Sequence, residues 1–281
     1  MREGAAINDF MRPDRVVIGT ESKRALEVMK EVYNPLYLIS TPIVSTNLET
    51  AELIKYASNA FLAVKISFIN EIAGICEAVG ADVVDLARAV GLDGRIGGKF
   101  LHPGPGYGGS CFPKDTLALL RIAQEHGVAA RLVEAGVEVN AAQKARMVKK
   151  IIDAMGGSVA GKTIAALGLT FKPETDDLRE SPALTILPPL VERGGRVQAH
   201  DPKGMEEARK ILPDFNYVNS AYEACEGADA VVLLTEWNQY RALDLARIKL
   251  KMKSPLFIDL RNVYEPAKMC DAGFKYVGVG R

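Results

Sequence analysis

Two patterns of hydrophobic and polar positions divide the chain. From residue 47 to about residue 155, apolar side chains recur three or four positions apart, as they do along amphipathic helices. After residue 156, short continuous apolar runs alternate with helical segments, as they do when strands are buried in a parallel sheet. The pattern predicts an α/β fold in which a helical central block precedes a Rossmann-like, doubly wound parallel sheet.

The longest predicted helix covers residues 47–79, with Thr46 or Asn47 as its cap and Gly80 at its end. It is far longer than the ~11–12 residues of an average helix, so we expect it to join two halves of the protein or two subunits. One face of this helix is expected to be core. That face is formed by Leu53, Ala57, Ala60, Phe61, Val64, Phe68 and Ile72.

The remaining elements follow from the same periodicities. The segment before residue 47 holds a strand at 14–19, a helix at 21–32 and an extended run at 35–40, which is too little to bury its own core. We therefore expect domains at 1–46, 47–155 and 156–281. Further helices are predicted at 82–90, 113–125, 130–155, 181–193, 203–211, 219–226 and 244–252, and strands at 163–169, 196–201, 228–235 and 255–260.

Composition and charge exclude several classes of function. The chain has 35 basic and 35 acidic residues, so nothing in its net charge favours nucleic acid or an anionic membrane as a partner. No apolar run approaches the ~20 residues of a membrane span, and no signal-peptide pattern is present. The four cysteines and three histidines are scattered, which indicates a reduced cytoplasmic protein without a structural metal.

The stretch GPGYGGSCFPKD, residues 104–115, contains the letters of a dinucleotide fingerprint in Gly104, Gly106 and Gly109. Such a fingerprint requires a strand before it and a second strand with an acid about 20 residues further on. Here the preceding residues are GGKFLHP, which is not an apolar strand, and only helices follow. Pro103 and Pro105 make the stretch stiff and extended. The pattern therefore does not favour a cofactor loop.

The same stretch offers a thiol at the start of a helix. Pro113 suits the first turn of a helix, so Cys111 would lie at the helix N-terminus beside Lys114. The helix dipole and the lysine would stabilise a thiolate, and the glycines would let a ligand approach the backbone. A small buried filler is the alternative for a free cysteine, and residue type and position leave both interpretations open.

The predicted sheet has Rossmann-like strand connectivity, but the loop that would bind phosphate differs from the usual pattern. Its first strand ends at Gly168 without a glycine fingerprint, whereas Asp201 ends the second strand, where a ribose-binding acid would lie. Lys172 and Arg179 are candidate phosphate partners, and ordinary solvated surface charges are the alternative for each.

Four motifs together resemble the UDP-glucose/GDP-mannose dehydrogenase family. They are ELIKYASNAFLA (52–63), GLDGRIGGKFL (91–101), GYGGSCFPKD (106–115) and GLTFKPETDDLRES (168–181), and they occur in the family's order over essentially the whole chain. The form of the second and third motifs resembles the UDP-glucose branch more than the GDP-mannose or UDP-N-acetylhexosamine branches.

This resemblance implies a reaction at a sugar C6 alcohol, which is oxidised to a carboxylate by two hydride transfers to NAD. It implies UDP-glucose as substrate, UDP-glucuronate as product and Cys111 as the nucleophile that holds the carbon covalently. Lys55 and Asn59, four residues apart on the long helix, would stabilise the oxyanion. Asp115 would orient Lys55 or assist the hydrolytic water, and a favourable first-turn acid is its alternative role.

The resemblance also implies binding residues and an assembly. Arg95 resembles a residue that reaches the substrate of a neighbouring subunit, which implies a homodimer along the long helix. Arg261 is followed by Asn262, where some relatives carry a second arginine. The implied substrate contacts are Glu3, Lys55, Asn59, Arg95, His102, Gly104, Gly106, Tyr107, Gly108, Phe171, Lys172 and Arg261, and the implied cofactor contacts are Cys111, Lys114 and Arg179.

One departure from the family pattern leaves the function open. The family begins with an NAD-binding domain that has its own glycine fingerprint, and this chain has none, so we expect the first third of the enzyme to be absent. The chain would then be an incomplete enzyme that forms no NADH alone. The alternatives are a non-catalytic, dimerising UDP-sugar-binding fragment and a dehydrogenase of GDP-mannose or a UDP-hexosamine.

Overall fold

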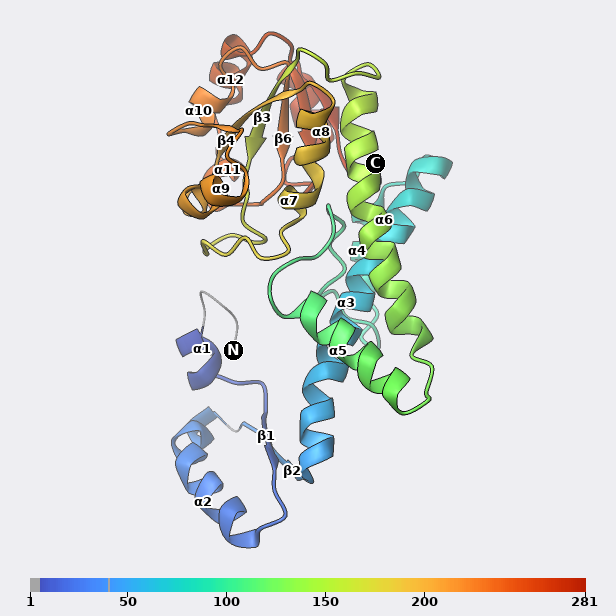
Figure 1. Cartoon of the computed structure of the whole chain (residues 1–281), viewed down its shortest axis with the longest axis vertical. Helices are drawn as coiled ribbons and strands as arrows, with labels where there is room; N and C mark the ends of the chain where they lie inside the picture. The colour runs from blue at the N-terminus through green and yellow to red at the C-terminus, as the bar shows by residue number, and fades with distance from the viewer. Residues whose placement is uncertain (1–5, 40) are drawn as a thin grey trace. The chain divides into compact units, whose positions relative to one another are not determined.

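The computed structural model describes residues 6–39 and 41–281 of the chain (Figure 1). The chain forms two compact units, residues 1–60 and residues 61–281. Glu3, a predicted substrate contact, lies outside the described residues.

The first unit is a small strand–helix–strand arrangement. It contains α1 (Ala6–Met11), β1 (Val16–Gly19), α2 (Lys23–Tyr33), the 3₁₀ turn η1 (Asn34–Ile39), β2 (Ile43–Thr46) and the beginning of the long helix. The two strands pair in parallel, from Val16 opposite Ile43 to Gly19 opposite Thr46. Its core is small and consists of Val16, Ile18 and Leu36, with partly buried neighbours.

Two of the three elements expected before residue 47 are confirmed. The predicted strand and helix correspond to β1 and α2, whereas the extended run predicted at 35–40 is wrong in its described part, which is the 3₁₀ turn η1. Pro35 explains the difference, because its fixed φ suits a helical turn as well as an extended segment. The sequence analysis did not predict α1 and β2.

The long helix α3 (Leu48–Val79) has its predicted bounds. The side chain of Asn47 caps it by accepting a hydrogen bond from the backbone N–H of Thr50, and Gly80 ends it with φ of +75°. The predicted core face is largely wrong, because Leu53, Phe61 and Phe68 are exposed. The buried positions carry mostly small or polar side chains: Ala60, Ala63, Ser67, Ile69, Asn70, Ala73 and Cys76.

The second unit continues α3 with three further helices and then a sheet. The helices are α4 (Val83–Gly91), α5 (Phe112–Glu125) and α6 (Arg131–Ala154), all close to their predicted bounds. Between α4 and α5 the chain forms no regular element, as its glycine content predicted. Asp82 caps α4 by accepting from the backbone N–H groups of Val84 and Asp85.

The sheet has six parallel strands in the order β5-β4-β3-β6-β7-β8. The strands are β3 (Thr163–Leu167), β4 (Arg196–His200), β5 (Asn216–Tyr217), β6 (Ala230–Leu233), β7 (Leu256–Asp259) and β8 (Lys275–Val277). The helices between them are α7 (Pro182–Ile186), α8 (Pro188–Glu192), α9 (Met205–Ile211), α10 (Ala221–Ala224), α11 (Asn238–Arg241), α12 (Leu245–Lys251) and α13 (Pro266–Asp271).

The predicted doubly wound parallel sheet is thus confirmed. The helix expected at 181–193 is divided into α7 and α8 at Pro188, which has no backbone N–H to continue the helical bonding. The sequence analysis missed β5, β8, α11 and α13, which are all short.

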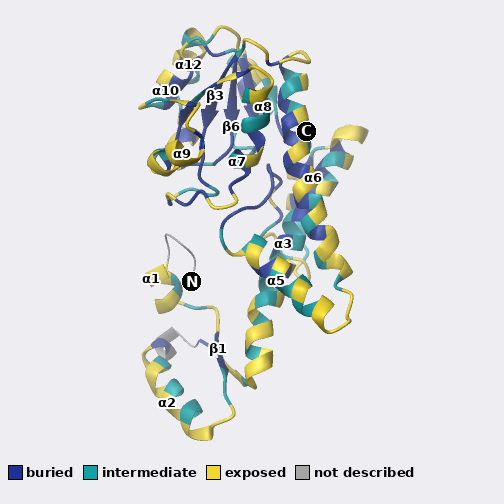
Figure 2. Cartoon of the chain, in the orientation of Figure 1, coloured by how far each residue is buried: buried dark blue, intermediate teal, exposed yellow. Residues whose placement is uncertain are grey.

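The two faces of the sheet bury separate cores, as the alternation of side chains along a strand requires. Along β3, Ile164 and Ala166 join one core, whereas Ala165 and Leu167 join the other. The first of these cores also contains Ile69, Met147 and Ile151, so α3 and α6 share it with the sheet. Figure 2 shows the strands and the inner side of α6 as buried, with exposed positions on the outer faces of the helices.

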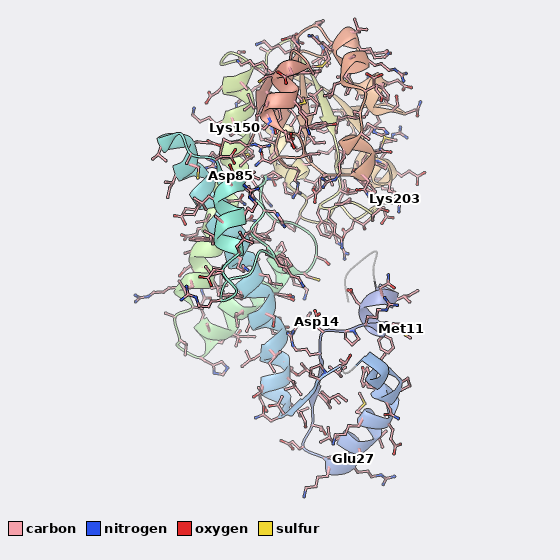
Figure 3. The ribbon with its side chains drawn as sticks, turned by 180° about the vertical axis from the view of Figure 1, so that it is seen from behind. Met11, Asp14, Glu27, Asp85, Lys150 and Lys203 are labelled. Atoms are coloured by element: carbon pink, nitrogen blue, oxygen red, sulfur yellow. The ribbon has the colours of Figure 1, made fainter. Side chains whose placement is uncertain are left out.

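The last residues of the chain bind to the helical block. The backbone of Gly280 accepts from the N–H of Val83 and donates to the carboxylate of Glu77 at 2.7 Å. That carboxylate also lies 2.8 Å from the ammonium of Lys150, a residue of α6 labelled in Figure 3. Although burial favours the neutral acid, the bonds from Lys150 and Gly280 lower the pKa of Glu77 below its ordinary value.

No helix in the part of the chain that the structure describes combines the length and the hydrophobicity needed to cross a membrane. Within residues 6–39 and 41–281, no group of three or more His, Cys, Asp or Glu side chains is placed to hold a metal ion. All four cysteines are free thiols.

Candidate functional site

The glycine-rich segment before α5 is a buried loop held by side-chain amides. The backbone N–H of Gly104 donates to Oδ1 of Asn70 at 2.8 Å, and Nε2 of Gln143 donates to the Gly104 carbonyl at 2.6 Å. The side chain of Asn140 binds both polar groups of the Tyr107 backbone, accepting from its N–H at 2.8 Å and donating to its carbonyl at 3.2 Å. The loop therefore has a defined conformation without regular secondary structure.

Three glycines of this loop are required by protein packing. A Cβ at Gly106 would lie 2.9 Å from Oδ1 of Asn140, and one at Gly108 would lie 2.1 Å from a backbone carbonyl oxygen, that of Glu180. At Gly109, where φ is +82°, a Cβ would lie 2.7 Å from the ring of Phe171. At these positions protein atoms occupy the space that a Cβ would need, and the expected approach of a ligand to the backbone of the loop stays a prediction.

Cys111 lies at the end of this loop and begins α5. It is exposed, whereas Cys76 and Cys225 are buried, and burial raises the pKa of the Cys225 thiol to about 12. Its carbonyl accepts from the N–H of Asp115, and its Sγ lies 3.8 Å from Oγ of Ser110. The interpretation of Cys111 as a buried filler is therefore wrong, and its thiol is accessible.

Asp115 and Lys114 form an ion pair in the first turn of α5. The carboxylate of Asp115 is fully buried, and the ammonium of Lys114, which is mostly exposed, lies 2.5 Å from it. A buried carboxylate needs such partners, because an unpaired charge inside a protein is strongly unfavourable. Asp115 thus brings a negative charge to within one helical turn of Cys111.

The segment after β3 packs against the glycine loop. The N–H of Gly109 donates to the carbonyl of Arg179 at 2.8 Å, and the ammonium of Lys172 lies 5.2 Å from the centre of the Phe171 ring. The guanidinium of Arg179 is bound to both carboxylate oxygens of Asp177. Phe171, Lys172 and Arg179 are therefore brought to the same part of the second unit as the loop that leads to Cys111.

Asp201 has a structural role that the sequence did not reveal. It is fully buried, and Oδ2 accepts from the backbone N–H groups of Leu169 and Thr170, while Oδ1 accepts from Lys203 and Gly204. The interpretation as a ribose-binding acid is wrong in this structure, because its oxygens hold the loop after β3 and are closed to solvent.

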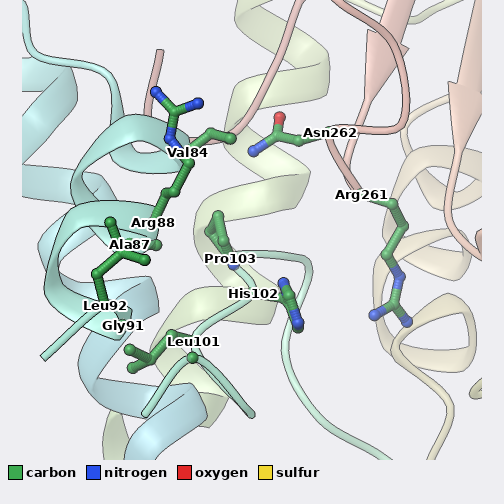
Figure 4. A pocket seen from close by; sticks show the side chains of 11 residues that line it. Val84, Ala87, Arg88, Gly91, Leu92, Leu101, His102, Pro103, Arg261 and Asn262 are labelled. Atoms are coloured by element: carbon green, nitrogen blue, oxygen red, sulfur yellow. The ribbon is translucent and has the colours of Figure 1, made fainter. Parts of the chain in front are cut away.

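A pocket of about 390 Å³ lies between α4, the start of the glycine loop and the turn after β7. Its wall includes His102 and Arg261, two predicted substrate contacts, together with Arg88 and Asn262. Figure 4 shows Arg261 on one side and the residues of α4 on the other, with His102 between them.

Arg261 is held in place from two sides. Its Nε donates to the Leu234 carbonyl at 2.7 Å and lies 3.1 Å from a carboxylate oxygen of Glu236, while Nη2 donates to the Phe171 carbonyl at 3.2 Å. A Cβ at Gly104 would lie 3.6 Å from Nη1 of Arg261. The structure therefore brings Arg261, Phe171 and the glycine loop together.

Arg95, another predicted substrate contact, is not among the residues that line this pocket. Arg95 is exposed and binds both carboxylate oxygens of Asp93, which raises the pKa of its guanidinium. Lys55 and Asn59 lie one turn apart on the part of α3 that belongs to the first unit, and their roles stay predictions.

The sequence analysis missed the amides that hold the loop: Asn70, Asn140 and Gln143. A signal was present, because these polar residues occupy buried positions of α3 and α6, where periodicity predicts apolar side chains. Polar residues at such positions indicate a bonding partner elsewhere in the fold.

Models of one protein family match most of the chain. The central-domain model of the UDP-glucose/GDP-mannose dehydrogenase family matches residues 49–142, and its UDP-binding-domain model matches residues 165–266. The chain belongs to this family. The family's NAD-binding-domain model matches residues 1–37.

Named relatives within the family agree with this assignment. A UDP-glucose 6-dehydrogenase of Rhizobium meliloti is 58% identical over the whole chain, and UDP-glucose 6-dehydrogenase TuaD of Bacillus subtilis is 49% identical. The chain spans 65% of the length of the first of these family members and 60% of the second.

Solved structures of the family agree on the fold. A UDP-glucose dehydrogenase from Pyrobaculum islandicum matches the whole chain with a TM-score of 0.90 at 39% identity, over 62% of its own length. This similarity supports the α/β fold with a long helix and a parallel sheet that the sequence predicted.

Proposed function

We propose that the protein acts as a UDP-glucose 6-dehydrogenase, which converts UDP-glucose to UDP-glucuronate with NAD as the oxidant. The observation that carries this proposal is the accessible thiol of Cys111 at the start of α5, at the end of a fixed loop and one turn from the buried Asp115. The resemblance to named UDP-glucose 6-dehydrogenases supports the choice of sugar nucleotide.

The residues present fit part of an NAD site. The cationic side chains of Lys114 and Arg179 are more than half exposed and would complement the charge of a pyrophosphate. A glycine-rich turn that would hold that pyrophosphate after a strand is not found in the sequence. When bound, NAD supplies the hydride acceptor for both oxidations.

The chemistry proposed for Cys111 follows from the oxidation levels of C6. The first oxidation removes a hydride from C6 and a proton from its hydroxyl, which gives an aldehyde. The thiolate then adds to the aldehyde carbon, and the former carbonyl oxygen takes a proton to give a thiohemiacetal. The second oxidation gives a thioester, and attack by water breaks the C–S bond, returns the thiolate and leaves a carboxylate.

The pocket lined by His102 and Arg261 is the proposed site for part of the nucleotide. Arg261 brings a fixed positive charge to its wall, and its neighbours Leu101, Pro103 and Ala87 are apolar. This combination suits a diphosphate next to a flat organic ring.

A homodimer through α3 is proposed from an exposed apolar stripe. Phe61, Phe68 and Ile75 are 65%, 49% and 54% exposed. Each of these residues follows the previous one by seven positions, which is about two helical turns, so all three lie on one face of the helix. A contiguous apolar surface of this kind is typical of an interface with another protein, and a second copy of the chain presents the same stripe.

The function is tested at Cys111 by chemical modification and by turnover. Iodoacetamide labelling of each cysteine is followed by peptide mass spectrometry with and without UDP-glucose, and NADH formation is followed at 340 nm. We expect UDP-glucose to slow labelling of Cys111 at least fivefold, with GDP-mannose ineffective, and Cys111→Ser to abolish any NADH formation. Cys270→Ser, which removes the other exposed thiol, is the matched control and should change neither measurement.

The outcomes separate the alternatives. Protection of Cys111 by UDP-glucose without NADH formation is expected both of the incomplete enzyme and of the non-catalytic UDP-sugar-binding fragment, whereas NADH formation would exclude the fragment. Protection by GDP-mannose or a UDP-hexosamine instead would change the substrate. Labelling that no sugar nucleotide slows would contradict the proposal.

A further inference from the structure

The buried face of α6 is polar where an ordinary helix would be apolar. Asn140, Gln143 and Lys144 are only 6%, 3% and 7% exposed, and they are followed on the same face by the fully buried Met147. A buried amide is unfavourable unless it is hydrogen-bonded, so this face needs a polar partner.

That partner is the glycine loop. Asn140 and Gln143 bond to the backbone of Tyr107 and Gly104, and Asn70 of α3 completes the set. Because no strand or helix lies between α4 and α5, the buried backbone of the loop has no regular hydrogen-bonding partner. Side-chain amides supply the hydrogen bonds that a neighbouring strand would otherwise supply. Asn140 is distinctive, since it satisfies both the donor and the acceptor of one residue.

Tyr107 connects the loop, which the amides hold in place, to the start of α5. Its ring packs edge-on against the ring of Phe112, with centroids 6.0 Å apart and an interplanar angle of 87°. Phe112 is the first residue of α5 and directly follows Cys111. A displacement of the Tyr107 backbone would therefore displace the thiol as well.

We propose that Asn140 is a positioning residue that sets the location of the Cys111 thiol for attack on the sugar carbon. Its catalytic meaning rests on the proposed function. The structural link from Asn140 through Tyr107 and Phe112 to Cys111 does not depend on it. A misplacement of reacting atoms by about 1 Å can reduce a rate by ~100-fold, so a loosened loop would have a measurable effect.

Lys144 provides a matched control on the same face. Its stem packs over Gly106, where a Cβ would lie 3.3 Å from the Lys144 Cγ. Within the described residues, no hydrogen bond joins the Lys144 side chain to the loop backbone. Burial lowers the pKa of Lys144, and the charge of Glu180 opposes that shift. Lys144→Met keeps the length of the stem and should leave the loop in place.

The test uses the C6 aldehyde of UDP-glucose as the probe, because thiohemiacetal formation needs no oxidant. Adduct formation is measured as protection of Cys111 from iodoacetamide, and UDP affinity is measured by calorimetry. We expect Asn140→Ala to weaken the adduct at least about tenfold, with UDP affinity and labelling without ligand each changed less than threefold. Lys144→Met should form the adduct like the unmodified chain.

A second variant guards against simple loss of folding. In Asn140→Asp the ionised carboxylate still accepts from the Tyr107 N–H but repels its carbonyl, whereas the protonated acid can donate and restore the bond. The adduct in Asn140→Asp, relative to the unmodified chain, should therefore recover as the pH is lowered from 8 to 5.5.

Each result decides a separate question. Undiminished adduct in Asn140→Ala, or equal losses in Asn140→Ala and Lys144→Met, would overturn the positioning role. Absence of pH-dependent recovery in Asn140→Asp would also contradict it. If the unmodified chain forms no adduct at Cys111, the proposed function fails, and the positioning role is then decided by hydrogen exchange at Tyr107 and Phe112, which Asn140→Ala should accelerate and Lys144→Met should not.

Discussion

The indole N–H of Trp237 lies 3.2 Å from the carboxylate of Asp201 in the interior of the parallel-sheet domain. Trp237 is the single tryptophan of the chain, so its fluorescence reports on this buried contact. In the native protein both carboxylate oxygens of Asp201 accept from backbone N–H groups. Asp201→Asn would replace one of these oxygens by an NH₂ group, which cannot accept those hydrogen bonds. We expect it to lower the free energy of unfolding by about 3 kcal/mol, measured by urea unfolding followed at Trp237.

An exposed aspartate supplies the control for that measurement. Asp214→Asn makes the same chemical change at the surface and should alter the unfolding free energy by less than about 0.5 kcal/mol. Equal effects of the two substitutions would show that the bonds of Asp201 contribute nothing to stability.

Gly168 is expected to be irreplaceable for two separable reasons. Its φ is +90°, and a Cβ would lie 2.5 Å from the Cβ and 2.7 Å from the backbone nitrogen of Thr235. Gly127 has a φ of +67° but open space around its Cα, so Gly127→Ala measures the conformational cost alone, about 1 kcal/mol. Gly168→Ala should cost at least about 2 kcal/mol more in urea unfolding, because the backbone of β6 and its following turn cannot move aside.

Stability should fall in acid through Glu77. Its pKa is lowered in the folded protein by Lys150 and Gly280, so its contribution is full above the unfolded pKa of about 4.3 and is lost as the pH falls through the lower folded value. Because Glu77 is partly exposed and water screens its ion pair, Glu77→Gln should destabilise the chain by only about 1 kcal/mol at pH 7 and by less at pH 3. Urea unfolding at both pH values tests this, with Glu71→Gln, an exposed acid of α3, as the control.

The proposed dimer depends on the exposed stripe of α3. Phe68→Asp would place a charge in the middle of that interface, and we expect the apparent mass in light scattering at micromolar concentration to fall from that of a dimer to that of a monomer. Leu250→Asp replaces a leucine of α12 that is even more exposed than Phe68 and should leave the mass unchanged. A dimer that persists in Phe68→Asp would place the interface elsewhere.

The sequence predicted what local patterns determine. Asn47, Gly80 and Pro113 mark helix ends by chemistry within one turn, and the bounds of α3 and α5 followed from them. The faces of α3 were not predicted correctly, because its core side carries alanines and amides while phenylalanines point outward. Hydrophobicity alone does not determine which face of a helix the fold buries.

The sequence indicated the thiol of Cys111, but it did not indicate the side chains that hold the surrounding loops in place. Pro113 and the glycines before Cys111 indicate its position at a helix start, because they lie next to it in the sequence. Asn140 lies 33 positions from Tyr107, and Asp201 lies 31 positions from Thr170, so their bonds exist only once the chain is folded. Residue type indicates such a bond, but the three-dimensional fold decides which backbone groups receive it.

The apolar core that α3 and α6 share with one face of the sheet has a consequence for how this protein can be divided. A cut near residue 156 would leave Ile69 and Met147 on one piece and Ile164 on the other, each with its apolar contact surface opened to water. The central helical segment and the parallel-sheet segment are therefore not interchangeable modules. A chimaera that takes one segment from a relative must take the facing side chains of the other as well.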